Sequence, residues 1–197
     1  MVLYNIDVNI YEDIRAYQPY NEQERCDKKN ILAFLEKYDD AFLRSNELGH
    51  MTASAWVVNE KHDKVLMAYH RIYDSWAWLG GHCDGDEDCL RVALREVAEE
   101  AGISEVQPLS EKIFSLEILG VDSHIRKGVY VPSHLHLNVT YLLQADEKQP
   151  LHIKADENKG VAWFFPDEAL DKTTEEWFKV NIYAKLCRKV RDLYENN

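Results

Sequence analysis

The segment from Gly81 to Ile103 reads GHCDGDEDCLRVALREVAEEAGI. Its spacing from residue 86 to residue 101 predicts a helix. At about 100° per residue, Glu100 lies about 40° and Glu99 about 60° from Glu96 around the helix axis. The sequence therefore places three carboxylates on one helix face.

An apolar stripe lies beside this acidic face. Its members fall between about 60° and 200° on the same helical wheel: Leu90, Ala93, Leu94, Val97, Ala98 and Ala101. We therefore expect the helix to dock on a sheet and to present its acids at an edge.

The clustered carboxylates favour a bound cation. Like charges three or four residues apart cost a helix roughly 0.2–0.5 kcal/mol per pair. A hard cation reverses that sign, because Mg²⁺ and Mn²⁺ prefer carboxylate oxygens. For an isolated E-x-x-E-E run, the alternative is a solvated surface with Glu99 paired to Arg95 four residues earlier.

The surrounding residues favour the cation. Gly81, Glu87, Arg95 and Gly102 join the three glutamates in the pattern G-x5-E-x7-R-E-U-x-E-E-x-G-U, where U is aliphatic. Seven fixed letters would coincide by chance with a probability of roughly 10⁻⁶ over this chain. The pattern is the Nudix box, and the chain resembles the Nudix hydrolase family.

This resemblance implies a fold and a reaction. The fold is an α/β/α sandwich with a mixed sheet, in the α/β (α+β) class. The reaction is cleavage of a diphosphate bond in a nucleoside diphosphate linked to another moiety, by attack of a metal-activated water on phosphorus. The resemblance assigns Mg²⁺, or Mn²⁺ as the alternative, to Glu96 and Glu100, with Glu99 assisting and the backbone carbonyl of Gly81 completing the shell.

The remaining box residues have supporting roles by the same resemblance. We expect Glu87 and Arg95 to pair, locking the loop against the helix so that Arg95 orients Glu96. Gly81 and Gly102 are expected at backbone conformations that other residues resist; without the box, each is equally an ordinary turn glycine.

The general base is left open among several acids. Glu99 is one candidate. Asp156 and Glu157, just before an expected strand, are others, because some family members carry an outlying acid there. Glu117 is a further candidate, although an alternating strand makes an ordinary exposed side chain the simpler interpretation.

Three residues are candidates for binding substrate phosphate. Arg126 and Lys127 lie in residues 120–133, a polar segment long enough to be a lid, with a solvated loop as the equal alternative. His136 shares one face of an expected strand with His134, where both rings could instead be satisfied within the sheet.

The substrate is less well determined. Residues 116–120 lack the proline typical of members specific for ADP-ribose, and the S-Q-P-W-P-F-P run of NADH diphosphatases is absent. Several aromatics are candidates to stack a base, although core positions are the commoner role for aromatics in strands: Trp56, Tyr69, Trp76, Trp78 and Tyr130.

The rest of the chain divides into two parts. We expect residues 1–48 to be a helical extension packed on the core, in which Asn21 and Glu24 resemble a capping box, and residues 49–197 to be the Nudix hydrolase domain. Strands are expected at 52–58, 64–69, 76–78, 113–119, 135–143 and 160–164, and a helix at 174–194.

Composition limits the partners and the compartment. Lysine plus arginine number 23 against 35 acidic residues, a net charge of −12. Such a chain repels nucleic acid. No membrane span or signal sequence is evident, and four cysteines without a disulfide framework favour a reducing cytoplasm. The expected partner is a small nucleotide-type molecule, and the oligomeric state is open.

Two other functions remain as alternatives. A nucleotide-sensing module of the same fold would bind without cleavage, although such a sensor need not retain the glutamates. A prenyl diphosphate isomerase relative would use a cysteine and a glutamate, and Cys83 lies near the box, but that branch departs from the standard pattern.

Overall fold

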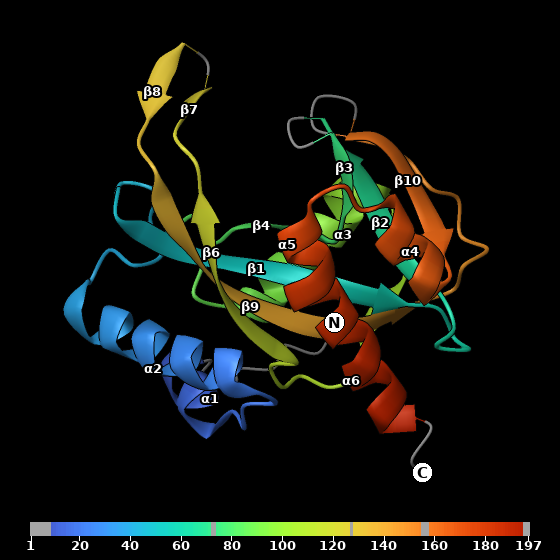
Figure 1. Ribbon diagram of the computed structural model, residues 1–197, viewed down its shortest axis with the longest axis horizontal. Helices are drawn as coiled ribbons and strands as arrows, with labels where there is room; N and C mark the ends of the chain where they lie inside the picture. The colour runs from blue at the N-terminus through green and yellow to red at the C-terminus, as the bar shows by residue number, and fades with distance from the viewer. Residues whose placement is uncertain (1–8, 72–73, 127, 155–157, 195–197) are drawn as a thin grey trace.

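Two long neighbouring strands form the centre of the fold (Figure 1). In the computed structural model, which describes residues 9–71, 74–126, 128–154 and 158–194, β1 (Gly49–Val58) runs parallel to β9 (His134–Ala145) along its entire length. The other pairings in this sheet are antiparallel. The sheet is therefore mixed.

The remaining strands extend this centre on both sides. They are β2 (Val65–His70), β3 (Ser75–Ala77), β4 (Leu79–His82), β5 (Val106–Pro108), β6 (Ser115–Val121) and β10 (Asn158–Phe164). The sheet order is β10-β2-β1-β9-β5, with β3 on β2, β4 on β1 and β6 on β9. A separate hairpin, β7 (His124–Arg126) and β8 (Val129–Val131), projects from one end of the sheet (Figure 1). The expected lid over 120–133 is thus a hairpin in its middle part.

Helices cover both faces of the sheet. They are α1 (Ile10–Ala16), α2 (Glu22–Lys37), α3 (Cys89–Ala101), α4 (Pro166–Lys172), α5 (Glu176–Phe178), the π-helical segment η1 (Lys179–Tyr183) and α6 (Ala184–Tyr194). Figure 1 shows α3 behind the sheet and α5 and α6 in front of it. Alternate β1 residues follow this division, because Met51 and Ala53 pack with α3 and Trp56 packs with α6. The predicted sandwich of a mixed sheet and helices is confirmed.

Helix α3 carries the Nudix box. Asp88 caps its first turn, because its side chain accepts a hydrogen bond from the backbone N–H of Arg91 at 3.0 Å. The helix therefore begins at Cys89, later than the predicted residue 86. Gly102 ends it in the left-handed region, with φ of 70°, which L-residues with a side chain resist.

The predicted apolar stripe of α3 is largely correct. Ala93, Val97 and Ala101 are buried, but Ala98 is exposed. Cys89 lies in the core, where its Sγ is 3.7 Å from that of Cys83.

The N-terminal helices pack on the sheet through α2. Asn21 caps α2 by accepting from the backbone N–H of Glu24 at 2.9 Å. Glu24 does not return this bond to Asn21; it accepts from the backbone N–H of Tyr20 and binds α6 through Lys185 and Lys189. The capping box is thus half formed, because Glu24 is held in the interior. The division of the chain at residue 48 stays a prediction.

The C-terminal helix differs from the continuous helix predicted over 174–194. It is interrupted by the five residues of η1, which separate α5 from α6. Over the described ranges, no helix combines the length and the apolar character that crossing a bilayer requires.

Candidate functional site

Glu96 and Glu100 lie against the glycine pair of β4. Only 8% of Glu96 and 6% of Glu100 is exposed. Glu100 Oε2 accepts a hydrogen bond of 3.1 Å from the backbone N–H of Gly80. The two acids are one helical turn apart, and β4 and α3 together hold them at the edge between sheet and helix.

Gly81 makes room for the carboxylate of Glu96. A Cβ at this position would lie 2.6–2.8 Å from the carboxylate atoms of Glu96. The backbone of Gly81 is outside the positive-φ region, which contains Gly85, Gly102 and Gly128 among the described glycines. The expectation of a restricted conformation is therefore correct for Gly102 and wrong for Gly81, which is needed for close approach.

Arg95 links the helix to the preceding loop, but its partner differs from the prediction. Its guanidinium donates to Glu96 Oε1 at 3.1 Å and to the carbonyl of His82 at 3.3 Å, and it lies 3.9 Å from Asp86. Glu87 is exposed and is not among the ion-pair partners found for Arg95 in the described part of the chain. The predicted Glu87–Arg95 pair is wrong, because Asp86 occupies that position.

Glu99 is the exposed member of the acidic face. Its Oε2 accepts from Lys154 Nζ at 3.1 Å, and its Oε1 lies 3.8 Å from Arg95. Lys154 thereby attaches the chain just before residues 155–157 to α3. Glu157 and Asp156 themselves lie outside the described residues.

The site suits a hard divalent cation. Burial raises the pKa of Glu96, and the neighbouring Arg95 opposes part of this rise. A buried carboxylate of this kind is stabilised by a cation. Carboxylate and carbonyl oxygens are also the ligands that Mg²⁺ prefers, so the residues present fit the metal that the box implies.

Glu117 does not belong to this site. Its side chain is completely buried, with Oε1 3.0 Å from Lys185 Nζ and Oε2 2.9 Å from Thr140 Oγ1. The expectation of an exposed side chain is wrong, because α6 covers this part of β6. A carboxylate bound in this way is not placed to serve as the general base.

Of the three candidate phosphate-binding residues, His136 is the one whose side-chain surroundings the structure describes. Arg126 is the last residue of β7, and Lys127 lies outside the described residues. His136 lies in a cluster of imidazoles with His50, His82 and His134, with ring centroids 4.7–5.2 Å from that of His136.

The sequence interpretation missed His50 and His82. His82 directly follows Gly81 in the box, and His50 opens the first predicted strand region, so both were visible as single histidines. Their proximity to His136 depends on strand register, which no local pattern contains.

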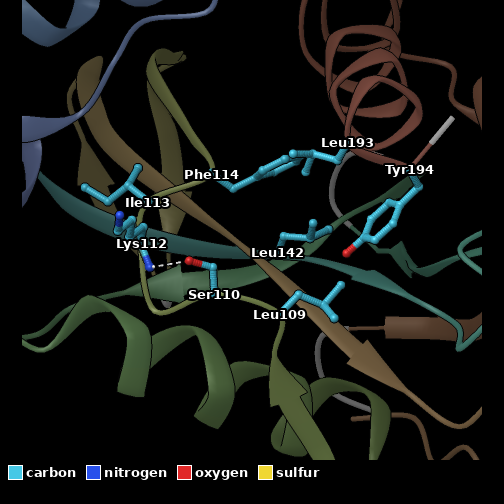
Figure 2. A pocket seen from close by; sticks show the side chains of 8 residues that line it. All are labelled: Leu109, Ser110, Lys112, Ile113, Phe114, Leu142, Leu193 and Tyr194. Carbon is cyan, nitrogen blue, oxygen red and sulfur yellow. Dashed lines mark hydrogen bonds between the residues drawn. The ribbon is translucent and has the colours of Figure 1, made fainter. Parts of the chain in front are cut away.

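A hollow of about 310 Å³ lies elsewhere on the molecule (Figure 2). It separates residues 109–114 from the end of α6, where Leu193 and Tyr194 line it. Its lining includes no residue of the box, so Glu96 and Glu100 lie outside this hollow.

Comparison with known proteins gives one family and one fold. A NUDIX domain model matches residues 49–186. A C. elegans Ap4A hydrolase in a binary complex is 18% identical with a TM-score of 0.55, covering 75% of this chain and 98% of its own. No curated protein matches.

Two further solved structures share the fold. The E. coli dihydroneopterin triphosphate pyrophosphohydrolase is 16% identical with a TM-score of 0.51, covering 75% of this chain and 96% of its own. The NUDIX domain of Shewanella oneidensis NrtR, complexed with ADP ribose, is 18% identical with a TM-score of 0.51, covering 82% and 96%.

Proposed function

The chain belongs to the Nudix family, and we propose that it is a metal-dependent hydrolase that cleaves the diphosphate bond of a nucleoside diphosphate linked to another moiety. The observation that carries this proposal is the buried pair Glu96 and Glu100, packed against the Gly80–Gly81 backbone of β4. Two acids gathered in the interior cost stability unless a cation compensates them.

The proposed ligands of Mg²⁺, or of Mn²⁺, are Glu96, Glu100 and Glu99 with the carbonyl of Gly81. When bound, the metal activates a water and neutralises charge on the phosphate oxygens. Arg95 holds Glu96 in place through its 3.1 Å contact. Gly80 holds Glu100 through its backbone N–H.

Two acids are proposed as the general base. Glu99 is exposed, but Lys154 and Arg95 already engage its carboxylate, and these contacts compete with taking up a proton. Glu157 lies outside the described residues and stays the second predicted base. Because the contacts of Glu99 compete with proton uptake, we favour Glu157 as the base and assign Glu99 mainly to assisting the metal.

The substrate is proposed as a small nucleotide-type molecule. The names of the matched structures include Ap4A, ADP ribose and dihydroneopterin triphosphate, so these compounds belong in the test panel. Arg126, Lys127 and His136 stay predicted phosphate contacts. A cytoplasmic location and the absence of nucleic-acid and membrane partners also stay predictions.

A substrate screen tests the proposal. The protein is incubated with Mg²⁺ or Mn²⁺ and with nucleoside triphosphates, dinucleoside polyphosphates, nucleotide sugars, ADP ribose and coenzyme A, and products are identified by mass. We expect cleavage of at least one compound, no cleavage after chelation, and at least a 100-fold loss of kcat/KM in Glu100→Gln. Glu105→Gln, an exposed acid just beyond the box, is the control and should retain activity.

The outcomes separate the alternatives. Tight nucleotide binding without cleavage across the panel would replace the hydrolase with a sensing module. An allylic product from a prenyl diphosphate would instead indicate an isomerase.

A further inference from the structure

We propose that His50, His82 and His136 form a second metal site, which binds a Zn²⁺-type transition metal ion and is separate from the carboxylate site. The three residues come from the adjacent strands β1, β4 and β9. One ligand atom from each lies within 4.8 Å of the other two. The cluster is therefore assembled by the sheet itself.

Strand register explains why the three rings meet. His50 is paired with His136 across the parallel β1–β9 ladder, and His82 is paired with Thr52 across the antiparallel β1–β4 ladder. His50 and Thr52 are two residues apart and share one face of β1. The three histidines therefore project from the same face over neighbouring positions.

His50 is prepared to bind an ion. It is 4% exposed, and its Nδ1 lies 3.2 Å from the carbonyl oxygen of Asn46. A carbonyl only accepts, so Nδ1 carries the proton and Nε2 keeps its lone pair. Nε2 is buried without a hydrogen-bond partner, which destabilises the fold unless a ligand pairs with this nitrogen. Metal-binding histidines typically use one nitrogen for a backbone carbonyl and the other for the metal.

His134 offers a fourth nitrogen. Its Nδ1 lies 2.9 Å from the carbonyl oxygen of Pro132, and its Nε2 lies 3.3 Å from Nε2 of His136. Two nitrogens on a tetrahedral Zn²⁺ are roughly 3.3–3.4 Å apart, given Zn–N bonds of about 2.0–2.1 Å. This pair already has that spacing, and the ligand atoms of His50, His82 and His136 lie within 4.8 Å of one another.

The charge state of the cluster supports metal binding. Burial, followed by the neighbouring imidazoles, lowers the pKa of His136 to about 2, and burial lowers the pKa of His50. Both rings are therefore neutral near pH 7 and offer lone pairs. The cation Arg44 near His50 is held by Asp84 through two contacts of 2.6 Å, so its charge is compensated.

The imidazole ligands also indicate which class of metal ion the site would prefer. They favour Zn²⁺, Ni²⁺, Co²⁺ or Cu²⁺ over Mg²⁺, which prefers oxygen ligands. The geometry supports a metal, because three imidazoles from three strands converge and Nε2 of His50 is buried without a hydrogen-bond partner.

The proposed site and the carboxylate site lie on opposite faces of β4. Gly81 faces α3, where the carboxylate of Glu96 packs against it. His82 is the next residue, and consecutive strand residues point to opposite faces. The two sites therefore use different side chains and favour different metals, so they can be tested separately.

Direct metal binding tests the proposal. The chelator-treated full chain is titrated with Zn²⁺ by calorimetry in the presence of excess Mg²⁺, and with Co²⁺ by visible absorption, where tetrahedral nitrogen ligation gives strong bands. We expect one equivalent of Zn²⁺ to bind. His50→Ala and His136→Ala should each weaken Zn²⁺ binding at least 100-fold, whereas Glu100→Gln should leave it unchanged.

The controls keep the result independent of folding. His62→Asn removes a histidine in the turn between β1 and β2, where φ is 58° and asparagine is tolerated; it should bind Zn²⁺ like wild type. Circular dichroism of the metal-free variants, together with His136→Gln, checks the fold. If the variants unfold, anomalous diffraction at the zinc edge from wild-type crystals must place the ion among the three rings.

The proposal is overturned if wild-type protein binds no Zn²⁺, if both alanine variants bind it like wild type, or if the ion lies elsewhere. Hydrolysis without Zn²⁺ binding would refute the histidine metal site and leave the proposed hydrolase function standing. Zn²⁺ binding without hydrolysis would support the histidine site and refute the proposed hydrolase function.

Discussion

The backbone N–H of Gly80 donates a hydrogen bond of 3.1 Å to Glu100 Oε2, across the boundary between β4 and α3. This bond attaches a proposed metal ligand to a rigid element of the sheet. Glu100 therefore contributes both a negative charge and a hydrogen-bond acceptor. Different substitutions remove one or both of these properties.

We expect Glu100→Gln to lose metal affinity but to keep the fold. The amide oxygen of glutamine still accepts from Gly80, while the negative charge disappears. Calorimetry should show Mg²⁺ affinity reduced at least 10-fold with little change in the free energy of unfolding. Glu100→Leu also leaves the N–H of Gly80 unpaired, so its free energy of unfolding should be lower by a further ~1–3 kcal/mol. Equal stability of the two variants would show that the bond contributes nothing.

Gly81→Ala should displace the carboxylate of Glu96. The new Cβ would lie 2.6–2.8 Å from its atoms, and the end of a flexible side chain moves more easily than the backbone. We therefore expect weaker Mg²⁺ binding and at least a 10-fold fall in kcat/KM, with a small change in melting temperature. Gly120→Ala is the matched control, because no atom lies within 4 Å of its Cβ position. Unchanged activity in Gly81→Ala would contradict the close-approach role.

Lys185→Met should be strongly destabilising. Lys185 Nζ lies 3.0 Å from Glu117 and 3.1 Å from Glu24, and all three side chains are completely buried. Removing one partner of a buried ion pair costs about 3–5 kcal/mol, which urea unfolding would measure. Lys172→Met removes an exposed pair with Glu168 at 3.8 Å and should cost less than about 1 kcal/mol. Similar losses in both variants would argue against the buried network.

Glu24 should contribute a pH-dependent part of the stability. Burial by itself raises its pKa, but the ammonium groups of Lys189 and Lys185 and a hydrogen bond from Tyr17 bring it below the ordinary value of 4.5. A carboxyl whose pKa is lower in the folded state stabilises the protein above pH 4.5 and loses this contribution as the pH falls through the folded pKa.

The difference in unfolding free energy between wild type and Glu24→Gln should therefore be largest above about pH 5 and shrink in acid. Urea unfolding from pH 7 down to the acid limit of the fold would measure it. Glu105 is exposed, so the unfolding free energy of Glu105→Gln should differ little from that of wild type at every pH. If the stability difference in favour of wild type instead grew in acid, the pKa of Glu24 would be raised in the folded state and not lowered.

Local patterns were enough to predict α3 and its acids. The spacing of Glu96, Glu99 and Glu100 depends only on the helical period, and Gly102 ends the helix through its own φ of 70°. The pairing of Arg95 was missed because Asp86 and Glu87 are adjacent in a loop. Only the loop conformation decides which of them reaches the guanidinium.

By itself, therefore, the sequence determined the family, the box helix and the carboxylates that we propose as metal ligands. The tertiary structure alone decided that Glu117 is buried against Lys185 and that His50 meets His82 and His136. A strand pattern of period two assigns a face but no partner. The parallel register of β1 with β9, which joins residues 86 positions apart such as His50 and His136, is set by packing over the entire chain.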